Sequence, residues 1–523
     1  MSESTVAIVG SGIAGTAIAH ALTLRGHDVV VFEKGPDFPY PAEKQFRESV
    51  LYDHSDPAGA IADDLGHMTE GNDGEKKLLP ERVMVVGGCA TQWAGIALRM
   101  APRDFRTRTL YRLDEDWPLS YEELEPWYGH AESLLGVSGT DDDNPFAPPR
   151  SRPFPLPPFE LSWDDRVLAA RLKSHGIHIH TTPQARTRLD YDGRPGCANI
   201  GTCYMCPIGA RYMPNHHLRL AAATGRCTVR SDVSVRRIVM DASGRARALV
   251  IRAHGTSADR EHAARVIVVA AGSFETPRLL LLSHDARHPD GLGNQGGHVG
   301  RHLVFHHLWS GHMHYREDLF AGRAGFWTGQ SHQFCDPPTR ARHGGIKVEF
   351  STAFAPQHEK RAASMSSAAA ALAAFEPARR CRRVTMHTES DTSPRKVVRL
   401  SEARDRFGDP CAHVEYRLSE YDRQTFRFGR ELFERVAAAS GASEREFCDI
   451  RDFDTYNHYM GTCRMGAGPA DSVVDPHGRV HGCPNLYLAG LSIFVGGGGP
   501  LNPTLTAVAL ALRTAEKIAE ELG

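Results

Sequence analysis

A glycine-rich turn near the N-terminus has the residue types and spacing of a site that binds phosphate groups. Gly10, Gly12 and Gly15 follow a short β-branched run over 5–9 and precede a segment of helical character over 17–24. The first glycine permits the turn, the second lets the backbone approach a pyrophosphate, and the third allows helix and strand to pack closely. The free N–H groups at the start of the helix attract an anion. The turn therefore predicts a dinucleotide site.

An acidic residue stands where a dinucleotide site needs one. A second apolar run over 28–32 follows a turn at Gly26 and ends at Glu33. A carboxylate about 20 residues after the glycines can accept the hydrogens of both ribose hydroxyls. The flanking strands and this acid together predict dinucleotide binding, although they do not separate FAD from NAD.

Three of the eleven cysteines lie close together, at Cys197, Cys203 and Cys206. Three thiolates, with a proline after the last, are enough ligands for a three-iron iron–sulfur cluster. The same segment is also compatible with a zinc site that uses His216 or His217, with a disulfide, or with free packed thiols. The cysteines as a whole lack the dense pattern of a small secreted domain, which favours a reducing compartment.

Bulk composition argues against several classes of function. The 523 residues carry 61 basic and 63 acidic side chains, with a formal charge of −2. This balance offers no reason to expect nucleic acid or an anionic membrane as the main partner, and it favours a small neutral substrate. No apolar run is long enough to cross a bilayer, and residues 1–5 lack the positive patch of a signal peptide. We therefore expect a cytoplasmic protein, unless a partner that bears a signal exports it.

Further along the chain, a second glycine-rich turn covers 87–95 and contains Trp93, a pattern that suits a clamp on a flat ring system. A helix is expected from Glu122 to Leu135, with Ser120 as its N-cap and Glu123 completing a capping box. Buried-strand patterns over 265–272 and 485–490 indicate that these segments also belong to the nucleotide-binding domain.

Several motifs, in order and spread over the whole chain, resemble one family, the glucose–methanol–choline oxidoreductases. A set of ordered motifs is far more specific than any one of them. They are the N-terminal glycine turn with Glu33, the loop 87–93, Ala270-Ala271-Gly272 with 275–280, and the closing segments 457–466, 475–480, 485–490 and 502–507.

The resemblance implies an α/β fold with two kinds of domain. One is an FAD-binding domain of the doubly wound, Rossmann-like type, and the other is a substrate domain built on an antiparallel sheet. The expected FAD-binding segments are 1–150, 226–293 and 456–523. The expected substrate-domain segments are 151–225, which includes the cysteines, and 294–455.

The resemblance also assigns roles to residues. His458 matches the family's catalytic base, and Asn502 would hold the same substrate hydroxyl from the other side while hydride passes to the flavin. Val233 would contact the adenine, and Gly490 with Thr504 would lie near the flavin. The expected cofactor contacts are Gly10, Gly12, Ile13, Ala14, Gly15, Glu33, Lys34, Gly88, Thr91, Trp93, Ala94, Val233, Ala271, Gly490, Asn502 and Thr504.

Within the family, the chain resembles the pyranose oxidases and the bacterial glucoside 3-dehydrogenases, because Asn502 stands where many members have histidine. Oxidation of a sugar or glycoside hydroxyl to a ketone is therefore expected, with position 3 of a pyranose favoured. Fungal pyranose oxidases bond FAD to a histidine in the loop where this chain has Gln92, so we expect non-covalent FAD.

The resemblance extends to how the flavin is reoxidised. The segment of Cys197, Cys203 and Cys206 is similar to one that passes electrons through a [3Fe-4S] cluster to a cytochrome, although one spacing differs. This similarity implies two partners, a small subunit and a cytochrome that accepts the electrons. Three other readings stay open: an oxidase that uses oxygen, a lyase that keeps FAD without using its redox chemistry, and an electron-carrying subunit without catalysis.

Overall fold

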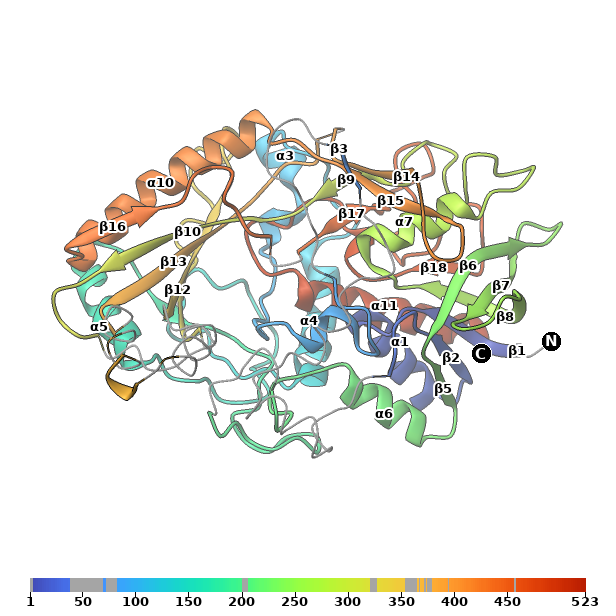
Figure 1. Cartoon of the computed structure of the whole chain (residues 1–523), viewed down its shortest axis with the longest axis horizontal. Coiled ribbons are helices and arrows are strands. Elements are labelled where there is room, and N and C mark those ends of the chain that lie inside the picture. Colours follow the sequence, from blue (N-terminus) through green and yellow to red (C-terminus); the bar gives the residue numbers. More distant parts are fainter. Residues whose placement is uncertain are drawn as a thin grey trace.

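The structure of the protein is a computed structural model. It describes residues 3–37, 69–71, 82–199, 206–319, 327–352, 365, 367–370, 373, 379–393, 395–455 and 458–523. Within this part of the chain, two large sheets form the two lobes that Figure 1 shows at its right and left.

The first sheet joins strands from the start, middle and end of the chain. Among the described residues it has seven strands in the order β5-β2-β1-β8-β7-β6, with β18 beside β8. The pairs among β5, β2, β1, β8 and β18 are parallel, and β6, β7 and β8 form an antiparallel meander. The strands are β1 (Glu3–Val9), β2 (Val29–Phe32), β5 (Cys227–Arg230), β6 (Val233–Met240), β7 (Ala246–Ala253), β8 (Arg260–Val269) and β18 (Leu486–Leu488).

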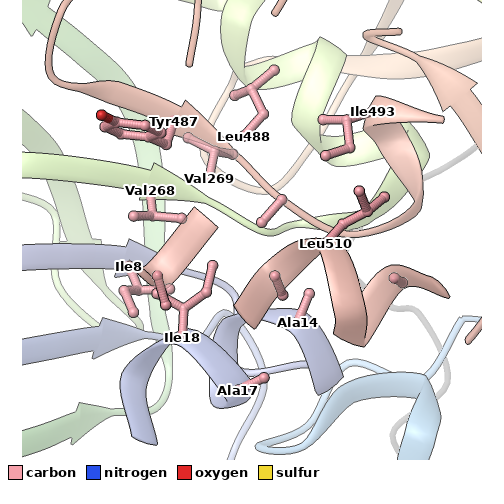
Figure 2. Packing of buried hydrophobic residues seen from close by; sticks show 14 of the residues in the cluster. Ile8, Ala14, Ala17, Ile18, Val268, Val269, Tyr487, Leu488, Ile493 and Leu510 are labelled. Carbon is pink, nitrogen blue, oxygen red and sulfur yellow. The ribbon is translucent and has the colours of Figure 1, made fainter. Parts of the chain in front are cut away.

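Two helices from opposite ends of the chain cover this sheet, α1 (Ile13–Leu24) and α11 (Thr504–Leu522). Figure 2 shows Ile8 and Val268 of the sheet above Ala14, Ala17 and other buried residues of the two helices. Alanine at those helix positions lets the backbones approach closely, and burial of the β-branched strand residues supplies the hydrophobic stabilisation. The parallel strands are buried on both faces, which explains their continuous apolar runs.

The second sheet is antiparallel and has six strands among the residues that the structure describes, in the order β16-β10-β13-β12-β11-β4. Helices α10 (Glu420–Ser440) and α5 (Trp163–Lys173) bury apolar side chains against one face of it. In Figure 1, α10 runs along the outer side of this lobe. The strands are β4 (His180–Thr181), β10 (His307–His314), β11 (Gly329–Ser331), β12 (Ile346–Thr352), β13 (Cys381–Thr388) and β16 (Glu444–Phe447).

Strand β12 shows how this sheet can contribute polar side chains to a site while it also forms part of the core. Its apolar residues Ile346, Val348 and Phe350 belong to the core under the helices. Because successive side chains of a strand point to opposite faces, Lys347 and Glu349 lie on the other face, although both are buried. One face of the sheet is therefore packed core, and the other carries buried charge.

The remaining described elements complete the two lobes. Helix α4 (Tyr121–Leu135) has Ser120 as its N-cap. The Ser120 hydroxyl accepts the Glu123 N–H and the Glu123 carboxylate accepts the Ser120 N–H, so the expected capping box is confirmed. The other elements are β3 (Thr69–Gly71), β9 (Arg301–Val304), β14 (Val397–Arg404), β15 (Pro410–Glu415), β17 (Met460–Thr462), α3 (Thr107–Tyr111), α6 (Asn215–Ala223), α7 (Gly272–Leu282), and short 3₁₀ helices at Gly88–Thr91, Pro102–Phe105 and Leu491–Ile493.

The fold class expected from the sequence, an α/β nucleotide-binding part with an antiparallel substrate sheet, is confirmed. In the described part of the chain, each helix is either too short or too polar to cross a membrane.

Candidate active site

A cleft of about 280 Å³ opens at the end of the parallel strands, where the glycine turn after β1 meets the turn before α7. Ligands of doubly wound folds bind at this end of the sheet. Ten of the residues expected to contact the cofactor line the cleft: Gly10, Gly12, Ile13, Ala14, Glu33, Lys34, Gly88, Val233, Ala271 and Gly490.

The glycines of the first turn have separate structural roles. Gly10 adopts a φ of +99°, and a Cβ at Gly15 would lie 2.1 Å from the Gly10 carbonyl oxygen, so neither position admits a side chain. Gly12 is different, because its backbone is extended with a φ of −61° and a Cβ there would meet nothing within 4 Å. The space above Gly12 is the cleft itself, so its missing side chain leaves room for a ligand that approaches the backbone.

The Glu33 carboxylate is held in place at the cleft wall. It accepts hydrogen bonds from the backbone N–H and hydroxyl of Ser11 at 3.0 and 2.6 Å and from the Gly35 N–H at 3.0 Å. Burial raises the pKa of Glu33, and these hydrogen bonds oppose that shift. The N-terminal end of α1 and this oriented acid together suit a pyrophosphate and a ribose, so the residues present fit FAD.

Other residues expected to contact the cofactor do not line the cleft. Thr91 is buried and its hydroxyl donates to the Gly88 carbonyl at 2.8 Å, while the Trp93 indole donates to the Tyr212 carbonyl at 2.8 Å. Ala94 packs against a small apolar cluster, and Thr504 is the first residue of α11. Thr91, Trp93 and Ala94 thus make contacts within the protein, and none of the four residues lines the cleft.

Some cleft residues were not expected from the sequence. Asp405, Phe407 and Asp409, in the turn between β14 and β15, close one side of the cleft, and Arg236 of β6 binds Asp409 there. Their only sequence signal is a turn-forming stretch, which does not indicate that the turn folds over a nucleotide site.

The two expected catalytic residues lie next to each other, although neither lines this cleft. Tyr459 lines the cleft, and His458 immediately precedes it. The His458 Nε2 atom lies 3.5 Å from the Asn502 Nδ2 atom, and both side chains are buried. An imidazole nitrogen and an amide N–H₂ that face the same point are able to hold one hydroxyl between them, one accepting and the other donating.

A buried ion pair from the antiparallel sheet supports Asn502. The Lys347 ammonium contacts both the Asn502 Oδ1 atom and the Glu349 carboxylate, and His387 of β13 donates from Nε2 to Glu349 at 2.7 Å. The His387 ring also lies 6.0 Å from the His458 ring. Sequence reasoning missed these three residues. For Lys347 and Glu349 the signal was the alternation of charged and apolar residues along β12, which predicts a strand with one charged face but not what that face meets.

The cluster is arranged to keep the imidazoles neutral. Burial lowers the pKa of His458 well below its usual value, and the nearby His306, His387 and Lys347 lower it further. Burial alone would raise the pKa of Glu349, but His387 and Lys347 beside it hold that pKa below its usual range. A neutral imidazole is the form that can accept a proton, so His458 has the protonation state of a general base.

The same face of the sheet continues with polar residues. Gln330 of β11 stands opposite Glu349 of β12 and beside His180 of β4, and all three are buried. Neither polar atom of the Gln330 amide, nor Nε2 of His180, has a hydrogen-bond partner among the residues described. Buried polar groups are nearly always hydrogen-bonded, so this face carries donor and acceptor atoms that the described residues leave unsatisfied.

The cysteine segment is only partly described. Cys203 lies outside the described residues. Cys197 and Cys206 belong to one small apolar cluster with Ala210 and Met213, and both are free thiols. A disulfide between those two is therefore not formed. Close by in sequence, Asp192, His216 and His217 bring three metal-ligand atoms within 4.8 Å of one another, held by hydrogen bonds to the Asp192 carboxylate.

Comparison with protein families gives matches along most of the chain. Residues 167–308 and 393–511 match the two family profiles described as GMC oxidoreductase. Residues 5–124 match a profile described as FAD dependent oxidoreductase, which covers the glycine turn, Glu33 and the second glycine-rich turn.

Two characterised relatives match over nearly their full lengths. The chain is 29% identical to the fructose dehydrogenase large subunit of Gluconobacter japonicus, over 99% of this chain and 98% of that protein. It is 27% identical to the C-glycoside 3-oxidase of Microbacterium trichothecenolyticum, over 100% of this chain and 97% of that protein. Both relatives are named for reactions on sugars or their derivatives.

Among solved structures, pyridoxine 4-oxidase from Mesorbium loti superposes with a TM-score of 0.65 at 20% identity, covering 98% of this chain and 99% of that chain. A formate oxidase superposes with a TM-score of 0.66 at 15% identity, covering 99% and 98%. At these identities the likeness concerns the fold alone.

Proposed function

Because the chain belongs to the GMC oxidoreductases, FAD-dependent enzymes whose characterised relatives act on alcohol groups, we propose that it oxidises a secondary hydroxyl of a sugar or glycoside to a ketone. Position 3 of a pyranose is the favoured carbon. The observation that carries the proposal is the pairing of His458 with Asn502 beside the polar face of the antiparallel sheet.

In this proposal, His458 is the general base. Its Nε2 atom accepts the proton of the substrate hydroxyl while the Asn502 amide donates to the same oxygen and holds it in place. FAD, held without a covalent bond by the cleft and its glycine turn, supplies the acceptor for the hydride that leaves the carbinol carbon. Gln92, where fungal pyranose oxidases have a linking histidine, supports the non-covalent attachment.

A hydroxyl-rich substrate agrees with the polar sheet face. The partnerless amide of Gln330 and Nε2 of His180, in the part of the chain that the structure describes, match the donors and acceptors of a polyol better than an apolar alcohol. The names of the relatives support this substrate class, and the C-glycoside 3-oxidase supports position 3.

The electron acceptor is a separate part of the proposal. The relative named as a large subunit supports a further, smaller subunit for this chain, and a cytochrome acceptor stays a prediction. The [3Fe-4S] cluster on Cys197, Cys203 and Cys206, and a cytoplasmic location, stay predictions. Iron and sulfide analysis of the purified protein tests the cluster directly, because three iron atoms per chain are expected if the cysteines are its ligands.

The main test is anaerobic titration of the flavin with a panel of pyranosides and simple secondary alcohols, followed by NMR of the product. We expect glycosides to bleach the flavin and to yield a ketone at position 3. Readmission of air then separates the acceptors, since rapid recolouring indicates an oxidase and slow recolouring a dehydrogenase. A flavin that no glycoside bleaches would refute the proposal and point to the lyase reading.

A further inference from the structure

A second histidine, His306, lies directly behind the base. It occupies the link between β9 and β10 and is fully buried. Its Nδ1 atom lies 3.1 Å from the Nδ1 atom of His458. Its Nε2 atom lies 3.1 Å from the Gly497 carbonyl oxygen and 2.9 Å from the Gly499 carbonyl oxygen. His306 therefore bridges the loop before Asn502 and the far side of the catalytic imidazole.

The partners of His306 determine where its hydrogen lies. Carbonyl oxygens only accept hydrogen bonds, so the Nε2 atom between the Gly497 and Gly499 carbonyls must carry a hydrogen. Burial, together with the nearby His387 and Lys347, lowers the pKa of His306 to about 3, so the ring holds a single proton near neutral pH. Its Nδ1 atom is then a bare acceptor.

The position of the hydrogen on His306 determines which ring nitrogen of His458 carries a hydrogen. Two imidazole nitrogens 3.1 Å apart form a hydrogen bond only if one of them carries a hydrogen. Because Nδ1 of His306 is bare, Nδ1 of His458 must be the donor. A neutral His458 then has no hydrogen on Nε2, and that lone pair faces Asn502.

Lys347 leads to the same result from the other side. An ammonium that contacts the Glu349 carboxylate can only donate, so it binds the oxygen of the Asn502 amide. The N–H₂ of that amide is left to face Nε2 of His458. A donor there is compatible with a bare Nε2 and would clash with an N–H. Two chains of contacts that begin at different places thus require one tautomer.

We infer that His306 is a positioning residue that fixes His458 in the neutral tautomer with hydrogen on Nδ1, leaving the Nε2 lone pair to accept the hydroxyl proton. The role of that lone pair in catalysis rests on the proposed function, whereas the tautomer itself does not. In the proton transfer, the substrate O–H bond breaks, its electron pair stays on oxygen, and a new N–H bond forms at Nε2. His306 does not touch the substrate and acts only through His458.

The tautomer is measured directly by ¹⁵N NMR of protein labelled at histidine. The ring signals of His458 are identified by their loss in His458→Gln. Hydrogen on Nδ1 of His458 at pH 7.5 is the expected result, and hydrogen on Nε2 would overturn the inference. Since no substrate is added, this result stands apart from the proposed function: a protein that oxidises no glycoside can still show the expected tautomer.

A pair of variants tests the consequence for rate. His306→Leu removes the acceptor behind His458, and His306→Asn can place an amide oxygen near the position of Nδ1. We expect the leucine variant to slow anaerobic flavin reduction roughly 10- to 100-fold with its flavin content retained, because unfixed tautomers compete, and the asparagine variant to recover most of the rate. A leucine variant that reduces flavin at the wild-type rate, or an asparagine variant as slow as leucine, would overturn the role. If neither variant folds, the NMR result on the wild-type protein decides.

Discussion

The nucleotide cleft and the catalytic cluster are built in opposite ways. Around the turn of Gly10, Gly12 and Gly15, the cleft is made largely of backbone: glycines that leave space, a helix N-terminus, and one acid held by neighbouring N–H groups. The catalytic cluster is made of side chains from distant strands and loops, namely His306, Lys347, Glu349, His387, His458 and Asn502, which orient one another.

This difference separates binding of the cofactor from chemistry on the substrate. A glycine turn made by local backbone tolerates changes elsewhere, whereas a cluster of mutually oriented side chains depends on every member. Variants of the cluster should therefore keep FAD and lose rate or stability, and variants of the cleft should lose FAD affinity while the cluster stays intact.

The largest effect is expected for His458→Gln. Loss of the base should lower kcat by about 10²- to 10⁴-fold, because glutamine can hold a hydroxyl but cannot accept its proton at neutral pH. The flavin content, read from the absorption spectrum, should equal that of wild type. His284→Gln, which alters an exposed histidine, serves as the matched control. Turnover within a few fold of wild type would remove His458 from the chemistry.

Next is Lys347→Met, which breaks the buried ion pair with Glu349. Removing one partner of such a pair leaves an uncompensated charge and costs about 3–5 kcal/mol of stability. Turnover should also fall, because the Asn502 amide loses the contact that orients it. Chemical denaturation and steady-state kinetics measure the two effects.

The double variant Lys347→Met/Glu349→Gln separates the loss of stability from the loss of turnover. It removes both charges, so much of the stability should return while turnover stays low. If the double variant regained turnover as well, the amide would not need Lys347, and the rate loss in the single variant would be an effect of stability.

A smaller effect is expected for Gly12→Ala at the cleft. The backbone there accepts a side chain, but the new Cβ would project into the space that the pyrophosphate needs. The Kd for FAD should rise on the order of tenfold, or about 1.4 kcal/mol. Fluorescence titration of apoprotein measures it. Gly468→Ala, which also places a Cβ in open space but away from the cleft, should leave the Kd unchanged. Equal affinity in both variants would show that the cofactor does not approach Gly12.

The smallest expected effect is on how the stability of the fold depends on pH. Burial lowers the pKa of His180 to about 4, whereas an unfolded histidine has a pKa near 6.5. Between these values the unfolded chain binds the extra proton, so this histidine's contribution to stability is full above pH 6.5 and is lost as pH falls toward 4. Asp114, whose pKa burial raises to about 6, acts in the opposite direction over the same range.

A variant isolates the histidine. His180→Gln should lose less stability than wild type between pH 7 and pH 5, measured as the shift in denaturant midpoint. An equal or larger loss in the variant would mean that His180 is protonated in the folded protein.

The sequence by itself determined the features that depend on neighbouring residues. The turn of Gly10, Gly12 and Gly15, the acid Glu33, and the capping box of Ser120 with Glu123 follow from local backbone geometry, so spacing alone predicts them. The order of the family motifs added the α/β fold and the choice of FAD, because several motifs in sequence constrain a whole architecture.

Only the tertiary structure decided which side chains complete the catalytic cluster. His306 and His458 are 152 positions apart, and Lys347 and Asn502 are 155 apart, so no local pattern connects them. Alternation along β12 predicts which side chains share a face, yet what that face meets depends on how the antiparallel sheet packs against the nucleotide-binding part. Those long-range contacts also determine which nitrogen of each histidine in the cluster carries a hydrogen, because the partners of its two nitrogens set a histidine's tautomer.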